Sequence, residues 1–180
     1  MKKVLFAIAA LATSLTASAQ FWIGGSLNLQ NQSYWNNDDA LTSWGITPSV
    51  GYALDDALEV GLDFGIQGRS QGKADVLQLD IAPFARYTFF SDGDFSMFLQ
   101  GNIAYEYNKT KVVAESKSWR FGVSIQPGIK YALTDQFSLV AKLGGLYFNH
   151  YDPDSPSTAN QNGFGLTFST GVSFGLVYSF

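Results

Sequence analysis

The chain has 180 residues, of which 14% are charged and 16% aromatic, and its formal net charge is −4. A soluble domain carries about 25% charged residues, so this composition is unusual for a protein that water surrounds on all sides. The excess of acidic residues argues against nucleic acid as a partner. The absence of cysteine excludes disulfides, thiolate metal ligands and a cysteine nucleophile.

The N-terminal segment has the organisation of a secretory signal peptide. Lys2 and Lys3 give a basic start, residues 4–15 are mostly apolar, and Ala17-Ser18-Ala19 forms an A-x-A cleavage site. The apolar stretch is too short to cross a membrane as a helix. We therefore predict that residues 1–19 are removed on export and that residues 20–180 form one domain.

Alternation of apolar and polar residues with period 2 runs through the rest of the chain, as is typical of strands with two different faces. The predicted strands are 21–31, 42–53, 58–69, 75–90, 95–108, 118–132, 136–151 and 163–180. Every second connection is short, at 54–57, 91–94 and 133–136, whereas the others are mostly longer and polar. This pattern predicts an antiparallel up-and-down meander.

A repeat, Ile-x-Pro-x-x-x-Tyr, occurs at 46–52, 81–87 and 125–131, each time just before a short turn. It indicates a copied hairpin unit. The prolines of the repeat are Pro48, Pro83 and Pro127. Because each proline removes one hydrogen-bond donor from the sheet, we expect a bulge or weakened pairing beside each of them.

The size of the apolar residues indicates which face of the sheet points outward. In the last predicted strand, even positions from Phe164 to Phe180 are apolar or aromatic except Thr170, and odd positions are glycine, serine or threonine except Val177. The large residues of all eight strands exceed the room inside an eight-stranded barrel, so they must lie outside. Such a barrel is stable only in lipid. The sequence therefore predicts an all-β fold, an eight-stranded antiparallel up-and-down transmembrane β-barrel.

Aromatic residues cluster at both ends of the predicted strands, as they do at the two membrane interfaces of such barrels. The cluster beside the short turns contains Tyr52, Tyr87, Tyr131 and Tyr178, and the cluster toward the long loops contains Trp44, Tyr105, Trp119 and Tyr147. We interpret them as two aromatic girdles.

Eight charged residues are predicted to point into the lumen. From the short turns outward they are Glu59, Arg86 and Lys130, then Asp63 and Lys142, and finally Asp80, Glu106 and Arg120. Each level contains both signs, and unpaired charges in a narrow lumen are costly, so we expect mutual pairing. A polar plug is favoured, because so small a barrel lacks room for a water-filled channel. A gated ion path is the alternative.

Evidence for catalysis is weak. The only histidine, His150, is followed by Asp152 and Asp154, but no serine is clearly placed as a nucleophile. No motif indicates a metal or cofactor, and the acidic loop at 152–162 lacks the spacing of an EF-hand. We predict a non-enzymatic protein without a cofactor.

The alternating strands, the girdles and the terminal Tyr178-Ser179-Phe180 resemble the small outer-membrane barrels of the OmpA/OmpX-like superfamily, the outer membrane protein beta-barrel domain proteins. The resemblance implies location in the bacterial outer membrane, with short turns in the periplasm and long loops outside. It also implies that Tyr178 and Phe180 form the signal read by the barrel-assembly machinery.

The resemblance leaves three functions open. The first is a structural role in envelope integrity, or surface adhesion and recognition through the loops at 32–41, 109–117 and 152–162. The alternatives are a narrow pore for ions or small solutes and a lipid A-modifying enzyme that uses His150. Outer-membrane lipid and lipopolysaccharide are the expected partners, and Lys109, Lys111 and Lys117 could contact lipopolysaccharide phosphates, with ordinary solvated loop charge as the other interpretation.

Overall fold

The structure is a computed structural model that describes residues 21–34, 37–71, 74–111, 115–153, 159–166 and 173–180. The predicted signal peptide lies outside these residues. No helix long and apolar enough to cross a membrane occurs in the described part of the chain. The strands are β1 (Phe21–Tyr34), β2 (Asn37–Ala53), β3 (Leu58–Gln71), β4 (Ala74–Asp92), β5 (Phe95–Lys111), β6 (Glu115–Ala132), β7 (Phe137–Lys142), β8 (Leu146–Asp152), β9 (Gln161–Leu166) and β10 (Ser173–Ser179).

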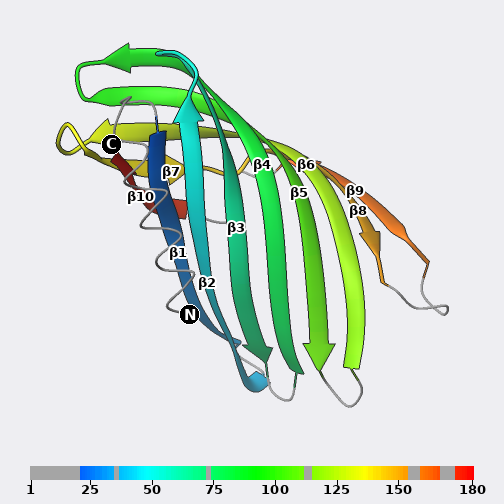
Figure 1. Cartoon of the computed structure of the whole chain (residues 1–180). Coiled ribbons are helices and arrows are strands. Elements are labelled where there is room, and N and C mark those ends of the chain that lie inside the picture. The colour runs from blue at the N-terminus through cyan, green and yellow to red at the C-terminus, as the bar shows by residue number, and fades with distance from the viewer. Residues whose placement is uncertain (1–20, 35–36, 72–73, 112–114, 154–158, 167–172) are drawn as a thin grey trace, which may run out of the picture.

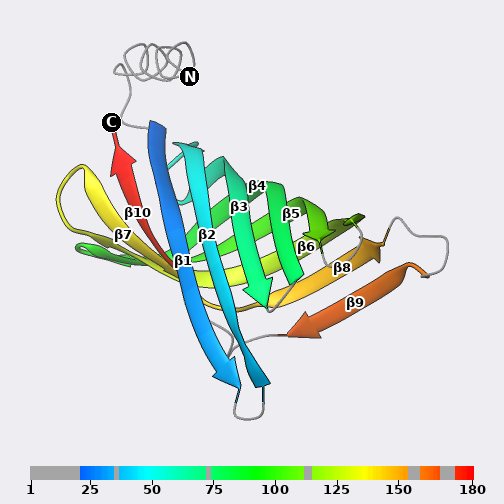
Figure 2. The same ribbon diagram turned by 90° about the horizontal axis from the view of Figure 1, so that it is seen from below.

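Antiparallel pairing closes eight of these strands into a barrel. Neighbouring strands pair from β1 through β7, β7 pairs with β10, and β10 returns to β1. The hairpin of β8 and β9 extends the wall from the far half of β6 (Figures 1 and 2). The prediction of an eight-stranded antiparallel up-and-down barrel is confirmed.

The barrel has two different ends, here called the short-turn end and, after the sequence prediction, the long-loop end. The prediction of long loops at 32–41 and 109–117 is wrong for most of their residues, because β1 extends to Tyr34, β2 begins at Asn37, β5 extends to Lys111 and β6 begins at Glu115. The connections β2–β3, β4–β5 and β6–β7 form the short-turn end, where Gly93 adopts a left-handed backbone with φ of 55°. Glycine adopts this conformation without steric cost, which suits the two-residue turn after Asp92. The C-terminus also lies here, and the Phe180 amide donates to the Phe21 carbonyl at 3.1 Å.

The three repeat prolines interrupt pairing as expected. Pro48 pairs with Gly25 of β1 but falls in a gap of the β2–β3 ladder, and Pro83 pairs with Leu62 of β3 but falls in a gap of the β4–β5 ladder. Pro127 pairs with Leu99, whereas its other edge faces the break between β7 and β8. Each proline thus weakens the contact with the strand that follows, because it has no amide hydrogen to donate.

One predicted strand is divided in the structure, which corrects the prediction. The predicted strand 136–151 is split at residues 143–145, where one extra residue shifts the register against β6. Gly145 lies so close to the carbonyl oxygen of Ile125 that no side chain fits, which is typical of a bulge. The predicted strand 163–180 appears as β9 and β10, and residues 167–172 lie outside the described residues.

The two faces of the sheet are as different as the alternation predicted. Exposed large apolar side chains cover the outside of the barrel, including Ile46, Phe64, Ile81, Leu99 and Phe121. In the last strands Phe164, Leu166, Phe174 and Leu176 are exposed in the same way, whereas Val177 is buried. The polar and small residues therefore line the lumen, where the candidate site must be sought.

Candidate functional site

A buried arginine occupies the centre of the lumen near the short-turn end. Arg86 of β4 donates from Nη1 to Glu59 Oε2 at 2.9 Å. Its Nε and Nη2 atoms donate to Gln100 Oε1 at 3.1 and 2.9 Å. Gln100 in turn donates from Nε2 to Asn102 Oδ1 at 2.8 Å. A guanidinium suits this place because its donors lie in a rigid plane and can bind several acceptors at once.

Lys130 of β6 approaches the same carboxylate from across the lumen. Its Nζ donates to Glu59 Oε1 at 3.1 Å, so Glu59 binds one cation with each oxygen. Glu59 is buried and the Lys130 amine is partly exposed. The three charges predicted for the lowest level are therefore in one cluster.

Three aromatic rings surround the Arg86 guanidinium. The Cζ atom lies 5.2 Å from the ring centroid of Trp22, 5.4 Å from that of Phe84 and 4.6 Å from that of Phe98. Trp22 and Phe84 also stack on each other, with centroids 6.0 Å apart. Val140 and Val177 complete this buried cluster. Cations over aromatic faces are attracted most strongly where water is excluded, so the rings stabilise the buried charge.

The sequence prediction missed this aromatic cluster, because it assigned large residues to the outside and small polar residues to the inside. Two signals could have found it. Phe84 and Phe98 share the alternation phase of Arg86 and Gln100, and Val177 is an exception among the small residues of the last strand. The cluster replaces the prediction of a purely polar plug by a plug of ions and aromatic rings.

Glycines on the inner face make room for the rings. A Cβ atom at Gly51 would overlap the indole of Trp22, one at Gly61 would overlap the ring of Phe84, and one at Gly128 would overlap the ring of Phe98. Glycine inside a strand often marks such a close approach. We refer to Arg86, Glu59, Gln100 and the rings of Trp22, Phe84 and Phe98 as the plug.

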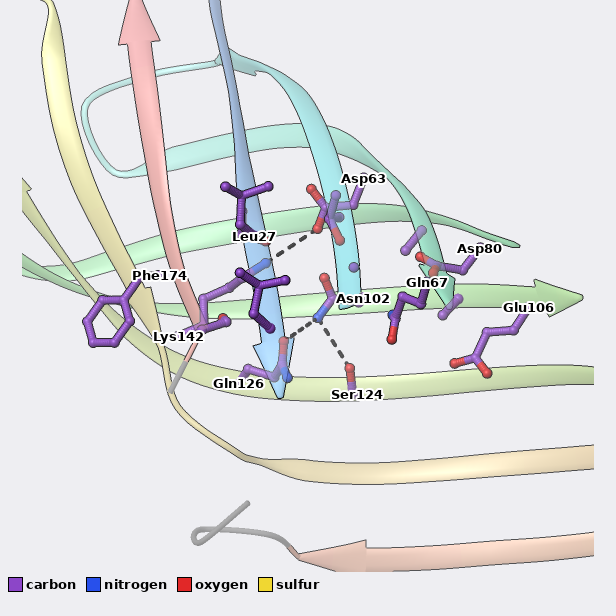
Figure 3. A pocket seen from close by; sticks show the side chains of 17 residues that line it. Leu27, Asp63, Gln67, Asp80, Asn102, Glu106, Ser124, Gln126, Lys142 and Phe174 are labelled. Atoms are coloured by element: carbon purple, nitrogen blue, oxygen red, sulfur yellow. Dashed lines mark hydrogen bonds and ion pairs between the residues drawn. The ribbon is translucent and has the colours of Figure 1, made fainter. Parts of the chain in front are cut away.

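The middle of the lumen holds two further polar groups. Asp63 accepts a hydrogen bond from Ser49 Oγ at 2.6 Å and pairs with Lys142 Nζ at 3.4 Å. Asn102 donates from Nδ2 to Ser124 Oγ at 3.2 Å and to Gln126 Oε1 at 3.4 Å. These contacts cross between strands on the long-loop side of the plug (Figure 3).

The upper level contains one pair and one carboxylate without a cation. Arg120 Nη1 lies 2.8 Å from Glu106 Oε2. In the described part of the chain, no lysine or arginine nitrogen lies within 4.0 Å of Asp80, and its Oδ1 atom is buried without a hydrogen-bond partner. The expectation of mutual pairing is therefore wrong for Asp80. Asp80 pairs in the ladder with Gly65 and Glu106, neither of which supplies a positive charge.

A cavity of about 740 Å³ opens on the long-loop side of the plug. Asp63 and Gln67 of β3, Asn102 of β5, Gln126 of β6 and Lys142 of β7 point into it (Figure 3). The small residues Ala82, Ala104 and Ser124 line the same cavity, and their size explains why it is not filled. The lumen is thus packed near the short turns and hollow toward the long loops.

His150 does not meet an acid or a nucleophile in the described residues. It pairs with Asn162 in the β8–β9 ladder, and its Nδ1 lies 2.7 Å from Asn162 Oδ1. Part of the loop that contains the neighbouring serines lies outside the described residues. No group of three or more metal-binding side chains occurs in the part of the chain that the structure describes.

All but one of the residues assigned to the aromatic girdles lie on the outer surface toward the two ends of the barrel. Tyr52, Tyr87 and Tyr131 are exposed near the short-turn end, and Trp44, Tyr105 and Trp119 are exposed toward the long loops. The girdle assignment is wrong for Tyr147, because the extra residue before β8 reverses the alternation: Tyr147 pairs with Ser124, which lines the lumen cavity, and therefore lies on the inner face. Tyr178 is half-buried, and its ring contacts those of Phe137 and Phe180, with centroids 5.0 and 5.1 Å away. The last residues therefore close the barrel and pack on its outer surface.

A closed barrel with an apolar exterior and with paired charges in its interior is a membrane-spanning β-barrel. Residues 4–180 match the family model described as "Outer membrane protein beta-barrel domain". The chain belongs to this family, and its place is the bacterial outer membrane. Comparison with curated proteins gives no match.

Solved structures share the fold. The chain is similar to Neisserial surface protein A, with 16% sequence identity and a TM-score of 0.59 over 91% of this chain and 98% of that one. It is also similar to the N-terminal β-barrel domain of Pseudomonas aeruginosa OprF, with 15% identity and a TM-score of 0.49 over 89% and 98% of the two chains. The likeness to Neisserial surface protein A supports a shared fold and nothing more specific, and no conclusion is drawn from the likeness to the OprF domain.

Proposed function

We propose that the protein is a non-enzymatic, non-conducting barrel of the outer membrane. In this proposal it contributes to envelope integrity, or to surface adhesion and recognition through the segments 32–41, 109–117 and 152–162 at its long-loop end, of which the first two are mostly strand. The short turns then face the periplasm and the long loops face the outside. The observation that carries the proposal is the plug, which fills the lumen near the short-turn end.

The plug is a poor path for ions. Arg86 and Phe98 are almost completely buried, and their contacts come from β1, β3, β4 and β5. An ion crossing the lumen would have to displace a guanidinium that is held by Glu59, by Gln100 and by three rings. Eight-stranded barrels have little interior space beyond that filled by side chains, so no wider route is expected around it.

The surroundings of His150 support the non-enzymatic part of the proposal. Its ring nitrogen contacts the side-chain amide oxygen of Asn162, and an amide cannot serve as the acid or nucleophile that a histidine-based mechanism needs. If His150 were catalytic, His150→Ala would change the lipid A mass spectrum of cells that express the protein. We expect identical spectra.

Single-channel conductance of the refolded protein in a planar bilayer tests the plug. We expect the wild-type barrel to be silent and the double variant Arg86→Ala/Phe98→Ala to show discrete openings, because that variant removes both the central cation and one ring. The variant shows that the recording detects an open lumen. Wild-type openings that change with Asp63→Asn or Lys142→Gln would replace the proposal by the narrow-pore alternative.

The role of the loops needs a separate experiment. Residues are deleted from the tip of each of these three segments in turn while the paired strands closer to the membrane are kept, and attachment of expressing cells to host or bacterial surfaces is measured. We expect at least one deletion to reduce attachment. Attachment that survives all three deletions would restrict the proposal to envelope integrity, for which sensitivity of a deletion strain to detergents is the readout.

A further inference from the structure

A row of residues crosses the outer face of five strands near the long-loop end. Trp44 of β2 pairs with Gly68 of β3, Gly68 with Leu77 of β4, Leu77 with Lys109 of β5, and Lys109 with Lys117 of β6. These strands lie side by side along one wall of the barrel (Figure 1). Two amines therefore stand next to an apolar surface on the side of the sheet that faces lipid.

The two lysines occupy directly opposite positions in an antiparallel ladder. Like charges in such positions repel each other and destabilise the pairing. Lys109 also takes part in another interaction within the chain. The attraction for an anion therefore rests on the combined positive charge of both lysines, and neither amine has to be without a partner. An anion located between both amines would relieve the repulsion.

The outer aromatic girdle places this row at the membrane interface. Tyr107 and Trp119 are paired two residues closer to the membrane centre, and their ring centroids are 4.6 Å apart. A strand rises by about 3.3 Å per residue, so the two lysines lie roughly 7 Å beyond the girdle. Aromatic girdles lie at the level of the lipid headgroups, so the lysines are at the depth of headgroup phosphates.

A cavity of about 620 Å³ lies beside Lys109. Its apolar wall on the outer face is made by Trp44 and Leu77. The indole of Trp44 lies against Gly68, where no side chain fits. The acid of the cavity, Asp75, already accepts a hydrogen bond from Ser70 Oγ at 2.8 Å. Lys117, opposite Lys109 in the β5–β6 ladder, adds a second cation next to the cavity, so the surface combines an apolar wall with two amines and one carboxylate.

We propose that this surface binds a phosphorylated glycolipid of the outer leaflet. The phosphate lies against Lys109 and Lys117, and one acyl chain follows Trp44 and Leu77 toward the membrane centre. Cations alone would suit any anion, but the adjoining apolar wall favours an anion that carries a hydrocarbon chain. The site lies on the opposite face of the sheet from the plug, so it does not depend on whether the lumen conducts.

Binding of diphosphoryl lipid A to the refolded full barrel, measured by native mass spectrometry in detergent, tests the proposal. The double variant Lys109→Gln/Lys117→Gln should bind roughly tenfold to thirtyfold more weakly than wild type. The matched variant Lys109→Arg/Lys117→Arg keeps both charges and should bind within about threefold of wild type. Dephosphorylated lipid A should bind the wild type as weakly as diphosphoryl lipid A binds the glutamine variant.

Two controls separate the proposal from simpler explanations. Both variants must show the heat-dependent gel mobility of the folded wild-type barrel, so that a loss of binding is not a loss of fold. Equal affinity of the glutamine variant and the wild type, or equal binding of both forms of lipid A, would overturn the proposal. Displacement of the lipid by millimolar inorganic phosphate would also overturn it, because the anion alone would then suffice for binding.

Discussion

The two halves of the lumen contain similar ion pairs in very different surroundings. Near the short turns, Arg86 and Glu59 are 2.9 Å apart with side chains that are 4% and 11% exposed. Near the long loops, Arg120 and Glu106 are 2.8 Å apart with side chains that are 38% and 20% exposed. The two distances are nearly equal, but three rings surround the Arg86 guanidinium, whereas Arg120 lies over the ring of Tyr151 and stays partly exposed. Burial is therefore the property that distinguishes a plug from a pair that lines an open cavity.

This difference arises from the size of a few inner residues. In the lower half, Trp22, Phe84 and Phe98 fill the space that Gly51, Gly61 and Gly128 leave open. In the upper half, small residues such as Ala82, Ala104 and Ser124 line much of the cavity, and Phe174 is the one aromatic ring among the described residues that line it. One alternating sheet can thus enclose both a dry core and a hollow.

The largest effect is expected from Arg86→Ala. This change leaves Glu59 with Lys130 alone and leaves the Gln100 oxygen without its donors, and breaking a buried pair costs about 3–5 kcal/mol. Urea unfolding of the refolded barrel measures the loss. The matched change in the open half is Arg120→Ala, which should cost less than about 1 kcal/mol because its pair is partly solvated. Equal losses would mean that burial does not distinguish the two pairs.

A smaller effect is expected from Gly61→Ala. The added methyl group would overlap the ring of Phe84 and displace it from Arg86, and overpacking of this kind costs about 1–3 kcal/mol. The control is Gly122→Ala, also on the inner face, where the nearest atom to a new Cβ is 3.5 Å away. That variant should change the free energy of unfolding by less than about 0.5 kcal/mol. A neutral Gly61→Ala would show that the plug is loosely packed.

The smallest effect has the opposite sign. Asp80→Asn removes a carboxylate that lacks a cation, so we expect a gain in stability on the order of 1 kcal/mol. The same substitution at Asp63, which is bound to Lys142 and Ser49, should lower stability. Both are compared by urea unfolding at neutral pH. If both variants lose stability, Asp80 has a favourable environment that the lumen contacts do not reveal.

Much of the architecture could be predicted, because it depends on local alternation. The number of strands in the barrel, the outward face and the weak pairing beside Pro48, Pro83 and Pro127 follow from period 2, residue size and the missing amide hydrogen. The split of the predicted strand 136–151 could not be predicted in the same way. Its extra residue keeps both segments apolar on the outside, so the alternation alone does not reveal where the register shifts.

The sequence by itself determined that this chain is a barrel with lipid outside and charges inside, since large residues cannot fit in so narrow a lumen. Only the tertiary structure decided which charged side chains form ion pairs with each other. Lys130 is 71 residues from Glu59 in the chain, and Lys142 is 79 residues from Asp63. Such contacts depend on strand register and on distances across the lumen, which no local pattern encodes. The same dependence placed three rings around Arg86 and left Asp80 without a cation.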